Sequence, residues 1–414
     1  MSINKDSQKA PILRFKGFTD DWEQRKVDEI ADKTFGGGTP KTSVEEYWNG
    51  DFPWVQSSDF ELGKLFDIEP SKFITKDAIA HSATKIVPEN SIAIVTRVGV
   101  GKLALMPYDY ATSQDFLSLS NLNINPVFGV YALFLLLEKE IKNIQGTSIK
   151  GITKSDLLEK VLTVTSDIQE QSKIGKFFKT LDDTITLHQR KLDQLNQLKE
   201  ALLQQMFPGK GETVPKLRFA GFEGEWEERK LGELGETKSG IGFPDDEQGG
   251  KKGIPFFKVS DMNNIGNEHE LKNSNNYVDT EQLKRRNWKP IMNVPAVIFA
   301  KVGAAIMLNR KRIVRMPFLL DNNTMAYIFD DSWNSDFGKI LFETIYLPRY
   351  AQVGALPSYN GSDINSIKVF IPNKKEQEKI GVFFKQLDNT ITLQQRKLNQ
   401  LQNMKQVLLQ NMFI

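Results

Sequence analysis

One stretch of this chain occurs twice and decides its fold. Residues Glu170–Phe207 read EQSKIGKFFKTLDDTITLHQRKLDQLNQLKEALLQQMF, and residues Glu376–Phe413 read EQEKIGVFFKQLDNTITLQQRKLNQLQNMKQVLLQNMF. The offset is a constant 206 residues, without a gap. A shorter repeat opens each half, with PILRFKGFTDDWEQRK at Pro11–Lys26 and PKLRFAGFEGEWEERK at Pro215–Lys230. The blocks between the repeats hardly resemble each other. The sequence therefore predicts one framework, arranged as an internal pseudo-twofold repeat, that carries two different domains.

The long repeat has the spacing of a coiled-coil helix. Apolar residues recur every seven positions, and a second set of apolar residues lies four positions after the first. These are the d and a positions of a heptad repeat. The predicted d positions of this seam include Ile174, Leu181, Leu195 and Leu202 in the first copy and Ile380, Leu387, Leu401 and Leu408 in the second. Each helix should be about 34 residues, or about 50 Å, long.

Polar residues interrupt the two seams at equivalent points, His188 with Gln394 and Lys199 with Lys405. Such residues lower the stability of a coiled coil but select one register. Because the duplication supplies both helices, we expect an antiparallel pair within one chain. A coiled coil between two copies of the chain is the alternative.

The chain divides into five segments. We expect a first domain over residues 11–160, a long helix over 168–207, a polar linker over 208–214, a second domain over 215–368 and a second long helix over 374–413. Short strand patterns separated by Gly, Pro, Asn and Asp indicate that both domains are mixed α/β. The predicted fold class is therefore mixed α/β, with two globular domains separated by two long antiparallel coiled-coil helices.

Composition excludes several classes of site. The chain has no cysteine, so disulfides, thiolate metal sites and cysteine nucleophiles are absent. The formal net charge is +2. The block Val27–Lys160 carries 13 basic and 18 acidic residues, whereas Leu231–Lys368 carries 17 and 16. A non-specific DNA-binding protein would be more basic, so any contact with nucleic acid must depend on local patches. No apolar run approaches the ~20 residues of a membrane span, and no signal peptide is recognisable, so we expect a cytoplasmic protein without a membrane partner.

Three short motifs approach catalytic signatures but are incomplete. Gly99–Lys102 lacks the earlier Gly and the following Ser or Thr of a phosphate-binding loop. Phe35–Gly38 approaches a methyl-donor-binding F-x-G-x-G motif, but Thr39 replaces its last glycine. Asn125–Phe128 lacks the second proline of the N-P-P-F motif of adenine methyltransferases. The histidines have no ligand-spaced neighbours and predict no metal site: His81, His188 and His269. We expect no catalysis by this chain.

Two framework motifs occur in both halves, LRFxGF-xxxWExRK at the opening of each half and EQxKI-xx-FF-xx-LD-x-TI at the start of each long helix. The paired segments Phe52–Trp54 and Ile254–Phe256, each followed by Ser-Asp, accompany them. With these motifs the chain resembles a DNA-specificity (S) subunit of a type I restriction-modification system, from Pro11 to Phe413. The resemblance implies two target-recognition domains that each read one half of an asymmetric bipartite DNA site. It also implies that the helices act as a spacer and as a docking site for modification subunits.

The same resemblance implies that catalysis resides in partner subunits. The expected partners are double-stranded DNA, two modification (methyltransferase) subunits and, in the full complex, restriction subunits. S-adenosylmethionine, ATP and Mg would be used by those subunits, and no cofactor is expected in this chain. A structural or regulatory adaptor that binds proteins without DNA specificity is the alternative, and the near-neutral charge favours it. A fragment of a monomeric restriction-methylation enzyme is a third possibility, which the missing catalytic motifs disfavour.

Residue type indicates which side chains could contact DNA, since Arg or Lys suits guanine, Asn or Gln suits adenine, and Ser or Thr is less specific. The candidates in the first domain are Thr39, Lys41, Ser57, Ser58, Arg97, Lys102, Ser148 and Lys150. Those in the second domain are Lys258, Ser260, Lys284, Arg285, Arg286, Lys301, Arg310, Arg312, Tyr359 and Asn360. The runs Lys284–Arg286 and Arg310–Arg312 are predicted phosphate patches. Arg97 and Lys301 lead the candidates, because each lies between a buried strand and a glycine turn.

Overall fold

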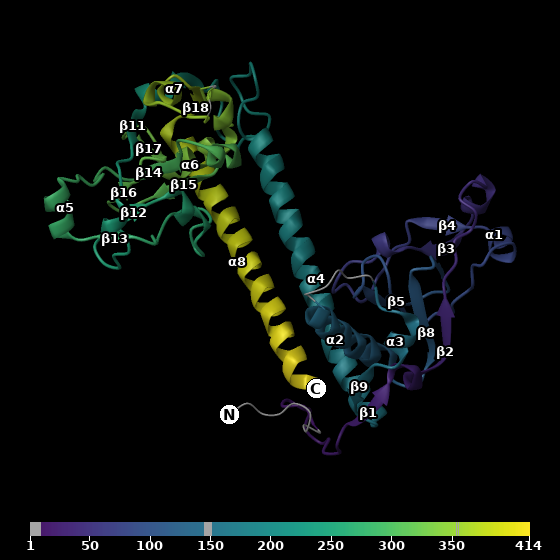
Figure 1. Ribbon diagram of the computed structural model, residues 1–414. Helices are drawn as coiled ribbons and strands as arrows, with labels where there is room; N and C mark the ends of the chain where they lie inside the picture. The colour runs from purple at the N-terminus through teal and green to yellow at the C-terminus, as the bar shows by residue number, and fades with distance from the viewer. Residues whose placement is uncertain (1–9, 145–150, 353, 355) are drawn as a thin grey trace. The chain divides into compact units, whose positions relative to one another are not determined.

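The structure is a computed structural model that describes residues 10–144, 151–352, 354 and 356–414 (Figure 1). The chain forms two compact units: unit 1 consists of Met1–Leu187 with Asn399–Ile414, and unit 2 of His188–Leu398. Helix α4 (Ile168–Gln205) begins in unit 1, and helix α8 (Lys374–Met412) begins in unit 2. Each unit therefore contains one globular domain, the start of one long helix and the end of the other.

The described part of the first domain contains a four-stranded, a three-stranded and a two-stranded sheet. The order of the four-stranded sheet is β2 (Ala31–Gly36), β8 (Phe116–Leu122), β5 (Ser91–Val95) and β6 (Leu103–Met106), with antiparallel neighbours throughout. The three-stranded sheet consists of β4 (Lys72–Ile74), β3 (Phe52–Val55) and β7 (Ala111–Thr112), and β3 runs parallel to β7. A further pair joins β1 (Glu23–Lys26) to β9 (Val161–Val164). The helices are α1 (Lys76–Ala80), α2 (Pro126–Ile144) and α3 (Lys154–Leu158).

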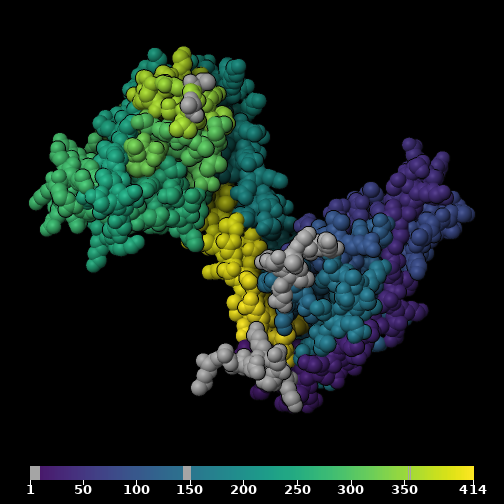
Figure 2. Space-filling view, in the orientation of Figure 1, coloured from purple at the N-terminus to yellow at the C-terminus, as the bar shows by residue number. Residues whose placement is uncertain are grey.

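The second domain repeats this topology with a different sequence. Its four-stranded sheet has the order β11 (Gly235–Ser239), β17 (Thr324–Phe329), β14 (Ala296–Ala300) and β15 (Lys311–Val314). Its three-stranded sheet has the order β13 (Tyr277–Val278), β12 (Ile254–Phe257) and β16 (Leu319–Leu320). Strand β10 (Glu227–Lys230) pairs with β18 (Lys368–Ile371), and the helices are α5 (Thr280–Arg286), α6 (Ser335–Thr344) and α7 (Gly361–Asn365). The lobe that holds β12, β13 and α5 extends away from the start of α8 (Figure 1; Figure 2).

An aromatic socket in each unit holds the end of a long helix. In unit 1, Phe413 stacks on Phe128 of α2 with ring centroids 5.2 Å apart and also contacts Trp22 and Phe178. In unit 2 the same arrangement surrounds the other helix end, through Phe207, Phe337, Trp226 and Phe384. The end of each long helix is thus part of the hydrophobic core of a domain built from the other half of the chain.

The repeated Glu-Gln pair anchors the start of each long helix. The buried carboxylate of Glu170 accepts two hydrogen bonds from Arg14, at 2.6 and 2.8 Å. Glu376 accepts the equivalent pair from Arg218, at 2.7 and 2.8 Å. A planar guanidinium matches a carboxylate in this two-point geometry, so the motif sets both the position and the direction of each helix. Five residues later, a Cβ at Gly381 would lie 2.7 Å from the backbone N of Phe337, which explains the repeated glycine.

The seam positions lie between the helices, which run antiparallel in each unit. All eight named seam residues are buried or half-buried. The polar interruptions are paired: His188 Nδ1 lies 3.0 Å from Gln394 Oε1 in unit 2. In the same unit Lys199 Nζ lies 2.6 Å from Asp388 Oδ1, and in unit 1 Lys405 Nζ lies 2.5 Å from Asp182 Oδ1. The predicted fold class, two mixed α/β domains with an antiparallel helix pair inside one chain, is confirmed. Among the described residues, no helix is long and apolar enough to cross a membrane.

Candidate nucleic-acid interface

The two leading basic residues follow equivalent strands but do not occupy equivalent positions. Thr96 and Lys301 each use the backbone N–H to donate to one loop and the backbone carbonyl to accept from another, at 2.7 to 3.1 Å. The partners are Asp115 and Ile152 in the first domain and Asn323 and Tyr359 in the second. Lys301 is therefore the counterpart of Thr96, and Arg97 lies one residue further along. Because successive side chains of an extended chain point to opposite sides, the domains present these cations differently. The shared pattern of strand, basic residue and glycine turn concealed this shift.

Three first-domain candidates lie at or beside the turn between β5 and β6: Arg97, Lys102 and Ser57. Arg97 is exposed in this turn. Lys102 Nζ donates to the carbonyl of Ser57 at 3.0 Å, which ties the turn to the 3-10 helix Ser57–Asp59. Ser58 of that helix is exposed. Thr39 Oγ1 donates to Gln114 Oε1 at 3.1 Å. Lys41 is exposed on its loop, and the other two candidates, Ser148 and Lys150, lie outside the described residues.

The second-domain candidates are more strongly engaged with their neighbours. Lys301 Nζ lies 3.2 Å from Ser239 Oγ at the end of β11. Lys258 is half-buried and donates to Gln248 Oε1 at 3.1 Å. Asn360 uses its side chain to accept from Asp363 N at 2.9 Å and so caps α7. Ser260 is exposed, and Arg310 contacts the side chain of Asn263.

Two predictions for this domain are wrong, because the side chains are needed inside the fold. Tyr359 is only 2% exposed and belongs to the core of the domain rather than to a surface loop. The run Arg310–Arg312 is not a surface patch, because Lys311 is 4% exposed and donates to Ile345 O at 2.6 Å. Burial lowers the pKa of Lys311 to about 8. Arg312 is half-buried and donates to Asn267 O at 2.7 Å.

The basic run on α5 is largely neutralised. Arg285 Nη2 lies 2.7 Å from Glu247 Oε2, and Arg286 Nε lies 2.8 Å from Glu247 Oε1. Hydrogen bonds from Arg285, Gln282 and Arg286 lower the pKa of Glu247 to about 2. Lys284 stays exposed. The predicted phosphate patch is therefore weaker than its sequence indicates, and two of its three cations hold α5 against the loop before β12.

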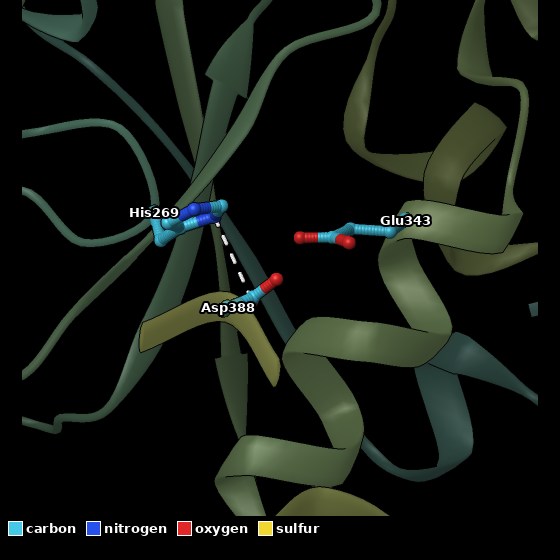
Figure 3. Close-up of side chains that lie close together, drawn as sticks. All are labelled: His269, Glu343 and Asp388. Atoms are coloured by element: carbon cyan, nitrogen blue, oxygen red, sulfur yellow. Dashed lines mark ion pairs between the residues drawn. The ribbon is translucent and has the colours of Figure 1, made fainter. Parts of the chain in front are cut away.

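Three possible metal ligands gather in unit 2, although His269 was expected to have no such neighbours (Figure 3). Side-chain ligand atoms of His269, Glu343 and Asp388 lie within 4.8 Å of one another. They come from the loop before β13, from α6 and from α8. Lys199 Nζ lies 2.6 Å from both carboxylates, and Lys339 Nζ contacts both as well. Two ammonium groups thus balance two carboxylates, which favours an ion-pair network over a cation site.

The electrostatics of this cluster fit the same interpretation. Burial lowers the pKa of His269, which favours the neutral imidazole. Burial by itself would raise the pKa of Glu343 and of Asp388, but Lys339 and Lys199 hold both below their ordinary values. Sequence spacing could not reveal the cluster, because its members lie on separate elements that only the fold brings together.

The structure also places cations that the sequence analysis missed. Lys154 begins α3, and its Nζ lies over the backbone of Gly36 at the end of β2. Arg97 and Lys85 are close enough to Lys154 for their charges to lower its pKa, in addition to the larger effect of burial. No motif connects these residues along the chain, so only the tertiary structure identifies the group.

Comparison with known proteins agrees with this architecture. A family model described as the type I restriction modification DNA specificity domain matches residues 19–197 and 223–403. The chain is 25% identical over 422 residues to the specificity subunit of the type I restriction enzyme MjaIX of Methanocaldococcus jannaschii, which covers 94% of this chain and 92% of that protein. It is 39% identical over 90 residues to the specificity subunit of the type I restriction enzyme EcoR124I/EcoR124II of Escherichia coli. That match covers 22% of this chain and 21% of the relative.

A solved structure has the same fold along almost the whole chain. The crystal structure of a type I restriction-modification system S subunit from M. genitalium superposes with a TM-score of 0.67 at 16% identity. The superposition covers 98% of this chain and 99% of that one. At this identity the likeness concerns the fold alone, whereas the family model matches most of both halves. The chain belongs to the family of type I restriction modification DNA specificity proteins.

Proposed function

We propose that this chain supplies DNA sequence specificity to a methyltransferase and restriction complex and catalyses no reaction itself. Each domain would read one half of an asymmetric bipartite site. The observation that carries this proposal is that the two domains share one topology but differ in the turns that follow β5 and β14, called the recognition turns. Where the first domain has Thr96 and Arg97, the second has Lys301 and Val302. Two identical readers related by a twofold would select a palindrome, so two different readers select two different half-sites.

The long helices provide docking surfaces for modification subunits in this proposal. Besides the seam, each helix carries apolar residues that face solvent in the chain by itself. Leu187 of α4 is 66% exposed, and its equivalent Leu393 of α8 is 65% exposed. Leu198 and Met404 form a second exposed pair at the same offset. Two equivalent surfaces suit two copies of one partner, because a pseudo-twofold framework presents the same contact twice.

The chemistry of the complex would reside in its partners, in the cytoplasm. S-adenosylmethionine would donate the methyl group in the modification subunits, and ATP and Mg would be used by restriction subunits. The residues of this chain would bind DNA, fix the register of the two half-sites and hold the partners together. Phosphate contacts would set position, and side chains at the base edges would set the sequence.

The test is to co-express the chain with its cognate modification subunit and to map methylated bases across the host DNA. One asymmetric, bipartite motif that carries the methyl group is the expected result. A stable complex that methylates no motif would contradict the proposal and favour an adaptor that binds proteins only. Binding measurements separate the two further, since a specificity subunit in its complex should lose DNA affinity steeply as salt rises.

A further inference from the structure

Three cations lie together above a run of glycines in the first domain. A Cβ built on Gly36 would lie 2.2 Å from Lys154 Nζ, so this lysine crosses the backbone at the end of β2. The hydrogen bond from Ile152 N to Thr96 O, at 2.9 Å, holds the segment that leads to Lys154 beside Arg97. Lys85 comes from the loop between α1 and β5, next to a threonine whose Oγ1 donates to Gly38 O at 3.1 Å. Three separate segments thus bring Lys85, Arg97 and Lys154 to one place.

The group carries uncompensated positive charge. Within the described parts of the chain, none of the three side chains has an ion pair or a hydrogen bond, and all three are exposed. Burial lowers the pKa of Lys154, and the neighbouring Arg97 and Lys85 lower it further, with no carboxylate opposing them. The surrounding block Val27–Lys160 has an excess of acidic residues, 18 against 13. Charges that repel one another without an internal counterion point to an external anion.

The glycine run beneath the cations leaves no room for side chains. A Cβ on Gly37 would lie 1.8 Å from the carbonyl O of Ser113, and one on Gly38 would lie 2.5 Å from the backbone of Ala83. At Gly36 the only atoms within 4 Å of an added Cβ belong to Lys154. Gly37 and Gly38 are thus covered by backbone, and Gly36 is the glycine that lies against a cation. The group of Gly36, Lys85, Arg97 and Lys154 is called the basic cradle below.

The second domain lacks this cradle. Thr153 and Asn360 cap the equivalent short helices α3 and α7, so Lys154 corresponds to Gly361. Arg97 corresponds to Val302, because Thr96 and Lys301 are counterparts. Two of the three cations are thus absent from the second domain. The cradle is a property of one domain and not of the shared framework.

We propose that the basic cradle binds phosphate groups of the DNA backbone at the half-site read by the first domain. This inference rests on the proposed function. Phosphate is favoured over a base edge because the cradle brings together three cations and includes no Asn or Gln with paired donor and acceptor groups. The exposed Val98, beside Arg97 at the tip of the turn, leaves an apolar contact available to a neighbouring base.

The experiment measures the affinity of the full chain, in complex with its modification subunit, for a duplex that carries the methylated motif. The variants are Lys154→Gln, Arg97→Gln and Gly36→Ala, each titrated between about 50 and about 200 mM salt. Gly36→Ala removes no charge, but its methyl group takes the place of the Lys154 ammonium. Lys26→Gln is the matched control, because it removes the same charge from a lysine that already has a carboxylate partner, Glu159, at 2.6 Å.

We expect Lys154→Gln and Arg97→Gln each to weaken binding about tenfold for all sequences, as for a lost charged hydrogen bond. The slope of log K against log salt should become shallower by about one per variant. Gly36→Ala should weaken wild-type binding and add nothing to Lys154→Gln, since both changes remove the same contact. Lys26→Gln should bind as wild type.

Two results would overturn the cradle while leaving the proposed function intact. One is a wild-type complex that binds its motif specifically while both charge variants keep the wild-type affinity and salt slope. The other is a variant that relaxes selectivity at a single base pair without a change in slope, which would assign a base contact. A wild-type complex with no preference for any motif would instead contradict the proposed function itself.

Discussion

The framework and the recognition turns follow opposite rules, although both occur twice in this chain. In the framework the contacts that anchor the helix starts are made twice with equivalent residues, as with Arg14–Glu170 and Arg218–Glu376. At the turn after the central strand, the first domain places Arg97 one residue beyond the position that Lys301 occupies in the second. A contact that must hold the same geometry in both halves repeats its residues. The turns after the central strands keep the same backbone hydrogen bonds but differ in their side chains, as the proposed function requires of domains that bind different half-sites.

The strongest break of the framework is the double substitution Leu195→Asp with Leu401→Asp. Both side chains lie half-buried in the seam, and an unpaired carboxylate there would carry a large desolvation cost. We expect the variant to lose the helix pair and, with it, the complex with the modification subunit in co-purification. Leu187→Asp with Leu393→Asp is the matched control for the seam, since these leucines are exposed and the helix pair should survive, as followed by circular dichroism. This control should still lose the complex, because both leucines lie on the proposed docking surface. Recovery of an intact complex with the seam variant would contradict the assigned role.

Next in size are substitutions in the recognition turns. Lys301→Ala should abolish site-specific methylation, whereas Arg97→Ala should lower it about tenfold through weaker DNA binding. Both complexes should assemble as in wild type. Arg97 is exposed, and Lys301 has one hydrogen bond to Ser239, so neither supports the core. Methylation sequencing together with size-exclusion chromatography measures both outcomes. Normal methylation of the motif by either variant complex would remove that residue from the interface.

The helix-end sockets test whether the two halves are energetically equivalent. Phe207→Ala and Phe413→Ala each empty an aromatic socket, and loss of a buried Phe costs about 3–5 kcal/mol. Because the sockets have the same members, we expect the two values from denaturant unfolding to agree within about 1 kcal/mol. Leu198→Ala, on the exposed face of α4, is the control and should cost much less. Clearly unequal losses in unfolding free energy would show that the two sockets do not stabilise the protein equally, despite their equivalent residues.

The smallest expected effect concerns the ion pairs of Glu247 with Arg285 and Arg286, called the α5 lock, which lie outside the repeated framework. The pKa of Glu247 is lowered to about 2 from 4.5, so its stabilising contribution is present above pH 4.5 and is lost as the pH falls towards 2. Glu247→Gln should therefore be less stable than wild type at neutral pH, and the difference should shrink below pH 4.5. Unfolding midpoints measured from pH 7 downwards test this. Glu281→Gln, elsewhere on α5, controls for the loss of a carboxylate, and a difference independent of pH would contradict the lock.

Sequence reasoning succeeded where the information was periodic or repeated. Heptad spacing depends only on the pitch of the helix, so the seam from Ile174 to Leu202 and its copy could be identified without knowing what surrounds them. The mixed α/β class of both domains followed from strand and turn patterns. The repeat also indicated an intrachain antiparallel pair, which the paired interruptions His188 and Gln394 bear out in unit 2.

Sequence reasoning failed where burial or register decided the outcome. Lys311 lies in β15 and donates to Ile345 O just after α6, and Tyr359 packs against Phe299 of β14, so both polar residues are buried. Arg97 and Lys301 look equivalent in sequence, because each follows a strand and precedes a glycine turn. The backbone hydrogen bonds show instead that the position of Lys301 in the second domain is equivalent to that of Thr96 in the first. Such bonds join positions tens of residues apart, and local composition does not record them.

The duplicated framework, the helix seam, the lack of cysteine chemistry and the family resemblance can all be recognised from residue spacing and identity along the chain. The fold is needed to establish which cations face solvent, which pair with Glu247, Glu343 or Asp388, and which lie near Gly36. Charges interact through space, so their partners depend on folding rather than on proximity along the chain.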